Sequence, residues 1–445
     1  MNNIAKIKRR VENIFKNFGV NKQRETVRLL YEICKREGTG YRDILPSIKE
    51  GEYSKVKKTL IKRRYPNAHM KGRALKLYLP QLEIYPGGEL KIEKKFKLYP
   101  SNVFIEDAVS NSYIVSRFRE HFPKASFKRI DSLKDYVRGR AFTIKDYNSR
   151  RDNFFIVREK YDFFKDCPCT SKAIFCGYNI FNLGLGCIYD CSYCYLQEYL
   201  KNSPGIIIPA NLKDFFSRFN ARSGIKSGIF NQPRVGNGEF ADSLALDGIT
   251  EFSGQIIEFF RKKPHIFFEF KTKSNNIENI LKTKPVSNIA VSWSLNPQKI
   301  IDENEFYTAS LAQRISAAKE CANAGLKVGF HFDPIIYYPH WEIDYENLIN
   351  NLFDKIPDKS IAWISLGTLR FNPSLKKTIE NRFPENKILD AELTLGFDKK
   401  LRYYQDLRII IYKKMKDWIR KRAGNIPIYL CMEEREVWKE FNGPQ

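Results

Sequence analysis

The chain has 445 residues, of which 43% are hydrophobic and 14% aromatic. This composition excludes a disordered chain, and the length exceeds what one hydrophobic core usually serves, so we expect two or three folding units. Lys and Arg outnumber Asp and Glu by 76 to 51, and the formal net charge of +25 favours a polyanionic partner, nucleic acid first. A basic surface that serves only solubility is the alternative.

Cysteine usage and the N-terminal residues bear on where the protein works. Nine cysteines are too few for a disulfide scaffold in a chain of this length, which predicts a reducing compartment. The first residues, MNNIAKIKRRVENIF, carry charges where a signal peptide needs an apolar core. Apolar runs stay well short of the ~18 residues that a membrane helix needs. We therefore expect a cytoplasmic protein without a membrane partner.

Residues 1–94 are predicted to form a basic, mainly helical domain. Apolar residues recur there at helical spacing, at Ile4, Ile7, Val11, Ile14 and Phe18. Gly19 is placed to end this helix, and a second helix is predicted from about residue 24 to 36. The region has 23 Lys and Arg against 10 Asp and Glu, so it carries over half of the net charge. It is a candidate nucleic-acid-binding domain.

From residue 95 onward, strand and helix patterns alternate. Runs such as NVFIE, FFIV, GIIIPA, HIFFEF, NIAVSWSL, KVGFHF and IAWISL alternate with amphipathic stretches such as TASLAQRISAAKECANAG. This alternation predicts a parallel α/β sheet or barrel, with chemistry on the loops after the carboxyl ends of the strands. We expect an N-terminal α/β region at 95–165, a partial parallel barrel at 166–375 and a closing segment at 376–445.

Three cysteines, Cys187, Cys191 and Cys194, crowd into the segment GYNIFNLGLGCIYDCSYCYLQEYL, on a Gly-rich loop between a short strand and a predicted helix. Thiolates are the usual ligands of iron–sulfur clusters, and one loop can wrap three of them around a 4Fe-4S cube. The fourth iron would then be open to the amino and carboxylate groups of S-adenosylmethionine, whose reductive cleavage yields a 5′-deoxyadenosyl radical. The Cys-x3-Cys-x2-Cys spacing is the signature of radical S-adenosylmethionine enzymes.

Other interpretations of the cysteines remain open. The three cysteines could be buried free thiols, or ligands of zinc if Cys169 or Cys176 supplied a fourth. Cys167, Cys169 and Cys176 are also a candidate second metal site. Two histidines, His331 and His340, fall at or after a predicted strand end, where packing and a place at the barrel mouth are both compatible with the sequence.

Five segments occur in the order in which the spore photoproduct lyase family has them: CGYNIFNLG with CSYCYLQ, RVGNGEFADSLALD, EFKTKSNNIENIL, SWSLNPQ and TASLAQRISAAKECANAGLKVGFHFDPII. From about residue 100 to the end, the chain therefore resembles this family of radical S-adenosylmethionine enzymes. The resemblance implies a radical-SAM partial barrel, lyase-like DNA repair, and an electron donor such as flavodoxin or ferredoxin. It does not extend to residues 1–94.

The resemblance also assigns residues that bind S-adenosylmethionine. Tyr193 matches the aromatic position beside the adenine. Gly236, Gly238 and Glu239 suit the element that grips the methionine amino group, since the glycines permit close backbone approach and the glutamate offers a carboxylate. A glycine turn with a solvated glutamate is the alternative.

Three further positions match residues that contact the methionine carboxylate and the ribose: Lys273, Ser294 and Asn296. An ammonium donor and short polar groups suit those roles. A surface lysine and polar groups that cap a strand end are the alternatives.

The sequence departs from the family at the hydrogen-atom donor. In the family, a cysteine lies shortly before the aspartate that matches Asp242, and here Glu239 stands in its place. A carboxylate cannot give a hydrogen atom to a carbon radical as a thiol can. Tyr195, which matches a tyrosine that relays hydrogen atoms, and Cys431 in IYLCM remain as candidate catalytic residues. A buried structural cysteine is the alternative for Cys431.

The predicted function is a radical S-adenosylmethionine enzyme that abstracts hydrogen from a substrate, with DNA as the first candidate. Reaching a base in duplex DNA would require nucleotide flipping, and the basic residues would supply the phosphate contacts. The loss of the donor cysteine keeps RNA, a peptide or a small molecule open as substrates. A non-enzymatic, metal-containing nucleic-acid binder is the third hypothesis.

Overall fold

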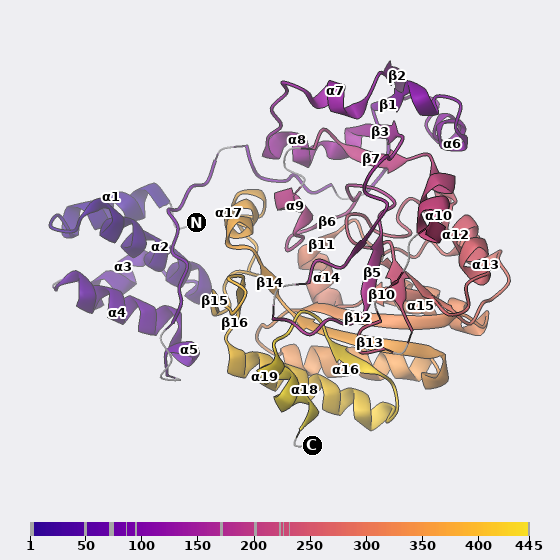
Figure 1. Ribbon diagram of the computed structural model, residues 1–445. Coiled ribbons are helices and arrows are strands. Elements are labelled where there is room, and N and C mark those ends of the chain that lie inside the picture. The colour runs from indigo at the N-terminus through magenta and orange to yellow at the C-terminus, as the bar shows by residue number, and fades with distance from the viewer. Residues whose placement is uncertain are drawn as a thin grey trace. The chain divides into compact units, whose positions relative to one another are not determined.

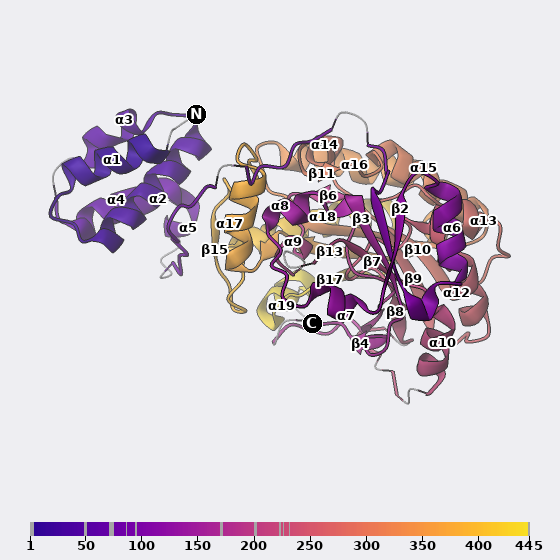
Figure 2. The same ribbon diagram turned by 90° about the horizontal axis from the view of Figure 1, so that it is seen from above.

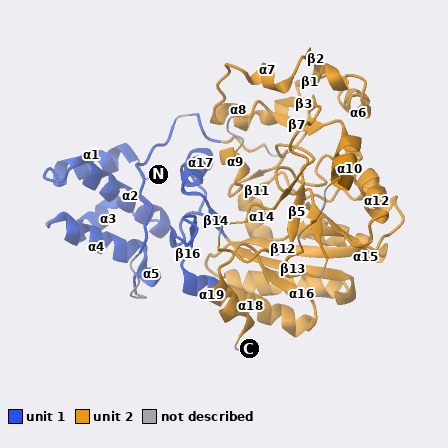
Figure 3. Ribbon diagram, in the orientation of Figure 1, with its two compact units in different colours: residues 1–89, 369–408 blue, residues 90–368, 409–445 orange. Residues whose placement is uncertain are grey.

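The structure is a computed structural model that describes residues 4–48, 51–70, 75–85, 87–93, 96–169, 172–199, 203–221, 224–225, 227–230 and 232–443. The chain forms two compact units (Figure 3): unit 1 comprises residues 1–89 and 369–408, and unit 2 comprises residues 90–368 and 409–445. The domain boundaries at residues 94, 165 and 375 stay a prediction. In the described ranges, no helix is both long and apolar enough to cross a membrane.

Unit 1 begins with a set of helices that pack on one hydrophobic core (Figure 1): α1 (Ile4–Ile14), α2 (Val20–Glu37), α3 (Tyr41–Ile44), α4 (Tyr53–Arg64) and α5 (Pro66–Met70). The predicted first helix is α1, although it ends before Gly19. The predicted second helix lies inside α2, which begins four residues earlier and ends at Gly38 in the left-handed conformation that favours glycine. Ile7, Val11, Leu30 and Ile33 are fully buried in this core.

A late part of the sequence completes unit 1. It contains α17 (Pro373–Arg382) and a small antiparallel sheet of β14 (Arg370–Phe371), β16 (Leu401–Tyr403) and β15 (Leu393–Leu395). Glu32 of α2 joins the N-terminal helices to this late segment. Its carboxylate accepts a hydrogen bond from Nε of Arg64 at 2.9 Å and forms an ion pair with Lys376 of α17. Burial raises the pKa of Glu32, but Lys376, Arg64 and Arg28 outweigh that effect and lower it to about 2. Unit 1 thus depends on contacts across more than 300 residues of sequence.

Unit 2 contains a four-stranded parallel sheet in the order β2-β1-β3-β7. Its strands are β1 (Asn102–Glu106), β2 (Ser126–Ile130), β3 (Asn153–Val157) and β7 (Ile206–Pro209). Around it lie α6 (Tyr113–His121), α7 (Leu133–Val137) and α8 (Ile144–Asn148). This is the predicted N-terminal α/β region, with the addition of β7, which comes from a later part of the chain.

The second sheet of unit 2 has eight strands in the order β17-β13-β12-β10-β9-β8-β5-β4 and is called the half-barrel below. Seven strands are parallel, and only the edge strand β4 (Phe164–Asp166) is antiparallel. The parallel strands are β5 (Tyr178–Phe181), β8 (Arg234–Gly236), β9 (Phe267–Thr272), β10 (Ile289–Ser294), β12 (Lys327–Ile335), β13 (Ile361–Thr368) and β17 (Ile428–Leu430). The predicted partial parallel barrel is therefore confirmed.

Helices cover one face of the half-barrel (Figure 2), among them α12 (Phe252–Arg261), α15 (Leu311–Asn323) and α16 (Trp341–Lys355). Side chains alternate along β9, as expected of a strand. Phe268 faces α12, where its ring lies 4.5 Å from that of Phe260, and Glu269 points to the opposite, inner face. The apolar side chains of β9 thus pack against the helices, and polar side chains such as Glu269 lie on the inner face of the half-barrel.

The inner face holds a buried ionic network around Glu269. Its carboxylate lies 2.7 Å from Nε2 of His331, 2.9 Å from Nη2 of Arg234 and 3.0 Å from Nε1 of Trp363. The Arg234 guanidinium also lies 4.0 Å from the centre of the Trp363 ring and contacts the hydroxyl of Tyr429 at 3.2 Å. Side chains of three other strands therefore converge on the carboxylate of β9, which explains the burial of His331.

The His331 network predicts a pH-dependent stability. Burial is the main cause that lowers the pKa of His331 to about 4, so the imidazole is neutral in the folded protein and charges on unfolding. Its contribution is complete above pH 6.5, the ordinary pKa, and is lost as the pH falls towards 4, by up to about 3 kcal/mol. Urea unfolding between pH 7.5 and 4.5 should show this slope. His331→Gln should flatten the slope and exposed His265→Gln should not; equal slopes in all three proteins would contradict the assignment.

Candidate active site

Cys187, Cys191 and Cys194 lie on the loop of residues 182–195, between β5 and α9 (Leu196–Tyr199), which we call the cysteine loop. Within it, β6 (Asp190–Cys191) pairs in antiparallel fashion with β11 (Glu305–Phe306), so that Cys191 stands opposite Glu305. Ser192 adds two bonds, from its hydroxyl to Oδ1 of Asn304 at 2.7 Å and from its N–H to the Asn304 carbonyl at 2.8 Å. These contacts tie the loop to the segment after β10.

Two arginines hold the other side of the cysteine loop. Arg150, which is fully buried, donates to the carbonyls of Cys187 at 3.0 Å and Tyr189 at 2.6 Å. Arg150 and Arg151 both pair with the buried carboxylate of Asp190, at 2.9 Å and 2.5 Å. Burying this charged cluster is favourable only because every partner is present. The loop is thereby fixed before any ligand binds.

Cys191 is buried, whereas Cys187 and Cys194 are partly buried. Burial raises the pKa of Cys187 to about 12, and burial also raises that of Cys191, against the field of the Lys273 ammonium. Three thiols on one fixed loop beside a cation suit an anionic iron–sulfur cluster, whose thiolates bind separate irons. Among the described residues, no three His, Cys, Asp or Glu side chains are arranged to hold a single metal ion.

Glu305 organises the side chains next to Cys191, although the sequence did not single it out. The Tyr193 hydroxyl donates to Oε1, and Nδ2 of Asn296 donates to the same oxygen at 2.8 Å. The second oxygen, Oε2, pairs with Nη2 of Arg314 at 2.6 Å. Arg314 also donates to the carbonyl of Ser294 at 2.8 Å. The structure therefore brings three predicted site residues, Tyr193, Ser294 and Asn296, into one buried network.

Lys273 lies just after β9 and faces the same network. Its backbone N–H donates to Oδ2 of Asp242 at 2.6 Å, and its Nζ lies 5.9 Å from the centre of the Tyr193 ring. Burial lowers the pKa of Lys273, but the charges of Glu305 and Cys191 outweigh burial and raise it, so the ammonium stays protonated. Among the described residues we find no hydrogen-bond or ion-pair partner for this ammonium, which is therefore available to an anion.

The glycines of the GNGE segment are required by packing. A Cβ at Gly236 would overlap the hydroxyl of Tyr178, and a Cβ at Gly238 would lie 2.9 Å from Cβ of Lys271. The amide oxygen of Asn237, between them, is buried and has no hydrogen-bond partner in the part of the chain that the structure describes. The segment thus follows β8 closely and presents a polar atom that a ligand can satisfy.

Glu239 is bound by another residue of the chain. Its Oε2 lies 2.9 Å from Nζ of Lys165 in β4, and its backbone carbonyl accepts the hydroxyl of Tyr195. Burial raises the pKa of Glu239, and Lys165 acts in the opposite direction. The carboxylate is therefore already paired with an ammonium group, the kind of group that the amino end of methionine would present.

Cys431 follows β17, at one edge of the half-barrel, whereas the cysteine loop follows β5, next to the other edge. The two edges are joined, because the N–H of Ile174 donates to the carbonyl of Glu433 at 3.1 Å. Cys167 and Cys169 lie just before this junction, with their sulfur atoms 3.7 Å apart. The hydrogen bond with the Cys169 thiol is the main cause that raises the pKa of Cys167, followed by burial and by the charges of Cys169 and Cys431.

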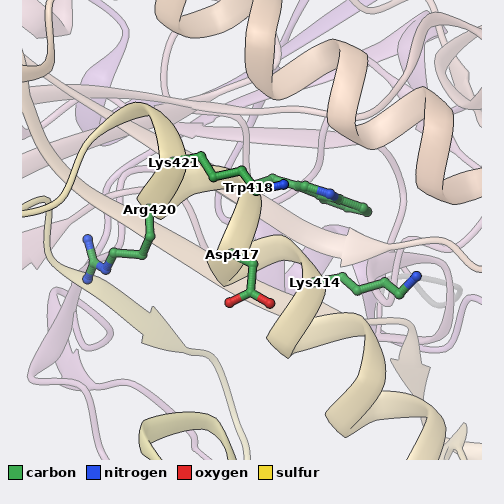
Figure 4. Close-up of a pocket in the computed structure, with 5 residues that line it drawn as sticks. All are labelled: Lys414, Asp417, Trp418, Arg420 and Lys421. Carbon is green, nitrogen blue, oxygen red and sulfur yellow. The ribbon is translucent and has the colours of Figure 1, made fainter.

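A separate surface pocket lies on α18 (Gln405–Arg422), within unit 2, and Figure 4 shows its lining residues: Lys414, Asp417, Trp418, Arg420 and Lys421. They include none of the predicted site residues. Lys414 pairs with Glu342 at 2.8 Å, and the Trp418 ring packs on Trp341. The pocket carries no chemistry that relates to the cysteine loop.

A three-cysteine loop after the first parallel strand of a half-barrel is the arrangement of radical S-adenosylmethionine enzymes. The family model of spore photoproduct lyase matches residues 143–424, and the chain belongs to this family. The resemblance inferred from the sequence is confirmed.

Curated relatives and solved structures agree with this family. Spore photoproduct lyase of Clostridium acetobutylicum is 30% identical over 209 residues, which are 46% of this chain and 60% of that protein. The Bacillus subtilis protein is 26% identical over 253 residues, 56% of this chain and 71% of the relative. A solved spore photoproduct lyase mutant with bound AdoMet and dinucleoside spore photoproduct covers 75% of this chain at 22% identity, with a TM-score of 0.63. The match to the Clostridium protein thus spans less than two thirds of its length.

Proposed function

We propose that this chain is a radical S-adenosylmethionine enzyme that acts on DNA in the manner of a spore photoproduct lyase. The observation that carries the proposal is the set of three cysteines, on a loop fixed by Arg150 and β11, beside the ammonium of Lys273, for which the described residues provide no hydrogen-bond or ion-pair partner. Cys187, Cys191 and Cys194 would hold the cluster. When bound there, a 4Fe-4S cluster supplies the electron that cleaves S-adenosylmethionine to a 5′-deoxyadenosyl radical.

The residues around the loop are suited to bind the methionine and adenosine parts. The Lys273 ammonium would pair with the methionine carboxylate, the Tyr193 ring would lie beside the adenine, and Asn296 with Ser294 would meet the ribose. Gly236 and Gly238 keep the backbone near the ligand. Lys165 contacts only Oε2 of Glu239, so the other carboxylate oxygen would accept a hydrogen bond from the methionine amino group.

Hydrogen transfer is the step at which this chain differs from its family. Tyr195 would relay a hydrogen atom through its hydroxyl, which reaches the Glu239 carbonyl. Cys431 is the proposed thiol donor, and its place at the junction of the two half-barrel edges supports that role. Glu239 itself has no hydrogen atom to offer to a carbon radical.

The case for DNA rests on charge and on the relatives. Solved spore photoproduct lyases carry a bound dinucleoside spore photoproduct. In this chain, Lys55, Lys58 and Lys62 of α4 recur at spacings of three and four, so they share one exposed helix face. Within the described ranges, none of the three ammonium groups has an ion pair or a hydrogen bond. Three unpaired ammonium groups in a row suit a phosphate backbone. A flavodoxin or ferredoxin is the proposed electron donor.

The second candidate function is the same radical chemistry on RNA, a peptide or a small molecule. The Lys165–Glu239 pair favours it, because a charged pair stands where the family places its donor thiol. The third, a nucleic-acid binder with a structural metal, predicts zinc and no iron in the protein purified and reconstituted under anaerobic conditions.

Glu239→Cys tests the proposed function. With reconstituted enzyme and irradiated DNA that contains spore photoproduct, we expect 5′-deoxyadenosine release that depends on the DNA. Glu239→Cys restores a thiol and should raise the rate of lesion reversal at least about tenfold, which corresponds to an activation barrier lower by about 1.4 kcal/mol. Glu239→Ser is the matched control, because it also leaves Lys165 unpaired but adds no thiol. Release that follows RNA or metabolites and not irradiated DNA would favour the second candidate.

Replacing Lys55, Lys58 and Lys62 by Gln tests the DNA contact. Each lost phosphate contact should make the slope of log affinity against log salt less negative by about 0.9. The slope of the triple variant should therefore be less negative than that of the wild type by about 2.7. Fluorescence anisotropy with duplex DNA between 50 and 200 mM salt measures this slope. A control variant removes the same charge from three exposed lysines of unit 2, Lys160, Lys213 and Lys319. An equal change of slope in the control would contradict the assignment to α4.

A further inference from the structure

The inner surface next to Cys191 contains a carboxylate with no assigned role. We propose that Glu305 is the positioning residue of the site, which orients Tyr193 and Asn296 for the adenosyl group of S-adenosylmethionine. The inference rests on the proposed function. It adds Glu305 to the predicted site as a residue that orients the side chains that contact the ligand.

The backbone places Glu305 at a fixed distance from the cysteine loop. β11 is only two residues long, and its pairing with β6 sets Glu305 directly opposite Cys191. Side chains of directly opposed residues in an antiparallel pair lie on the same face of the sheet. The carboxylate is 0% exposed and therefore cannot turn towards solvent. Its position follows that of the central thiol of the loop.

The contacts of the Glu305 carboxylate fix the orientation of the neighbouring side chains. Oε1 accepts from both Tyr193 and Asn296, and Oε2 pairs with Arg314. Arg314 is in turn held by the carbonyl of Ala309 at 2.9 Å and the hydroxyl of Thr308 at 2.7 Å. A buried carboxylate with all of these partners is a rigid acceptor.

Asn296 shows how strict the orientation is. Its Nδ2 donates to Glu305, and its Oδ1 accepts from the hydroxyl of Tyr345 at 2.6 Å. Tyr345 is fixed as well, since its oxygen accepts the N–H of Ile336 at 2.8 Å. The amide therefore cannot flip, and one N–H of Nδ2 remains for a ligand. We expect that N–H to donate to a ribose oxygen.

Tyr193 depends on the same carboxylate. It is the residue directly before Cys194, so its backbone belongs to the cysteine loop. The bond of its hydroxyl to Glu305 fixes the far end of the ring, while the backbone fixes the near end. With both ends of the ring held, the orientation of the Tyr193 ring face is fixed. The ring also faces the Lys273 ammonium, whose Nζ lies 5.9 Å from the ring centre.

Glu305→Gln in the reconstituted holoenzyme tests the inference. The change keeps the size and one acceptor but removes the charge. A lost charge-assisted hydrogen bond weakens binding about tenfold or more, so KM for S-adenosylmethionine should rise by at least that factor. We expect little change in iron content and in kcat at saturation. Exposed Glu303→Gln, two residues away in sequence, is the matched control and should behave as the wild type does.

Tyr193→Phe provides a second route if Glu305→Gln folds poorly. It deletes one of the bonds to Glu305 and leaves the pairing with Arg314 intact, so a smaller rise in KM, about threefold, is expected. Glu305→Asp should rescue part of the loss in Glu305→Gln. The inference is overturned if Glu305→Gln and Tyr193→Phe both hold the cluster and show wild-type KM. It is also overturned if the loss in Glu305→Gln follows its iron content alone. A wild-type protein that holds no iron would instead refute the proposed function.

Discussion

The pairing of Cys191 with Glu305 is the contact on which the site depends. It joins the cysteine loop, which follows β5, to a strand that comes more than 100 residues later, after β10. Through that pairing the loop shares its surroundings with Lys273, Asn296 and Arg314. Without it, the loop would keep its contacts with Arg150 and Arg151 but would lose the strand pairing that holds Cys191 opposite Glu305.

Buried charge recurs as the means by which this chain fixes its parts. Asp190 and Arg150 hold the outer side of the cysteine loop, Glu269 of β9 contacts side chains from β8, β12 and β13 inside the half-barrel, and Glu32 joins two distant segments of unit 1. Each carboxylate has its cations within contact distance, which is the condition under which buried ions are tolerated. Such networks cost desolvation but allow few alternative arrangements of the segments that they join.

Much of this structure was predictable from the sequence, for identifiable reasons. The half-barrel strands are apolar runs that contrast with amphipathic helices, and cysteine spacing is a local signal. Glu305, Arg150 and Lys165 were not predictable, because their roles arise from partners far away in the chain. The contribution of residues 369–408 to unit 1 is hidden for the same reason. The glycines of GNGE were assigned to the site by the resemblance to the family, whereas the structure shows that close packing requires them.

The most direct test is electron paramagnetic resonance of the anaerobically reconstituted, reduced protein before and after addition of S-adenosylmethionine. Binding of the amino and carboxylate groups at an open iron changes the cluster's electronic environment. The account predicts the signal of a reduced 4Fe-4S cluster, with g values that shift when S-adenosylmethionine is added, and loss of the cluster signal in Cys191→Ala. A protein that holds zinc without iron, or a cluster signal that S-adenosylmethionine leaves unchanged, would contradict it.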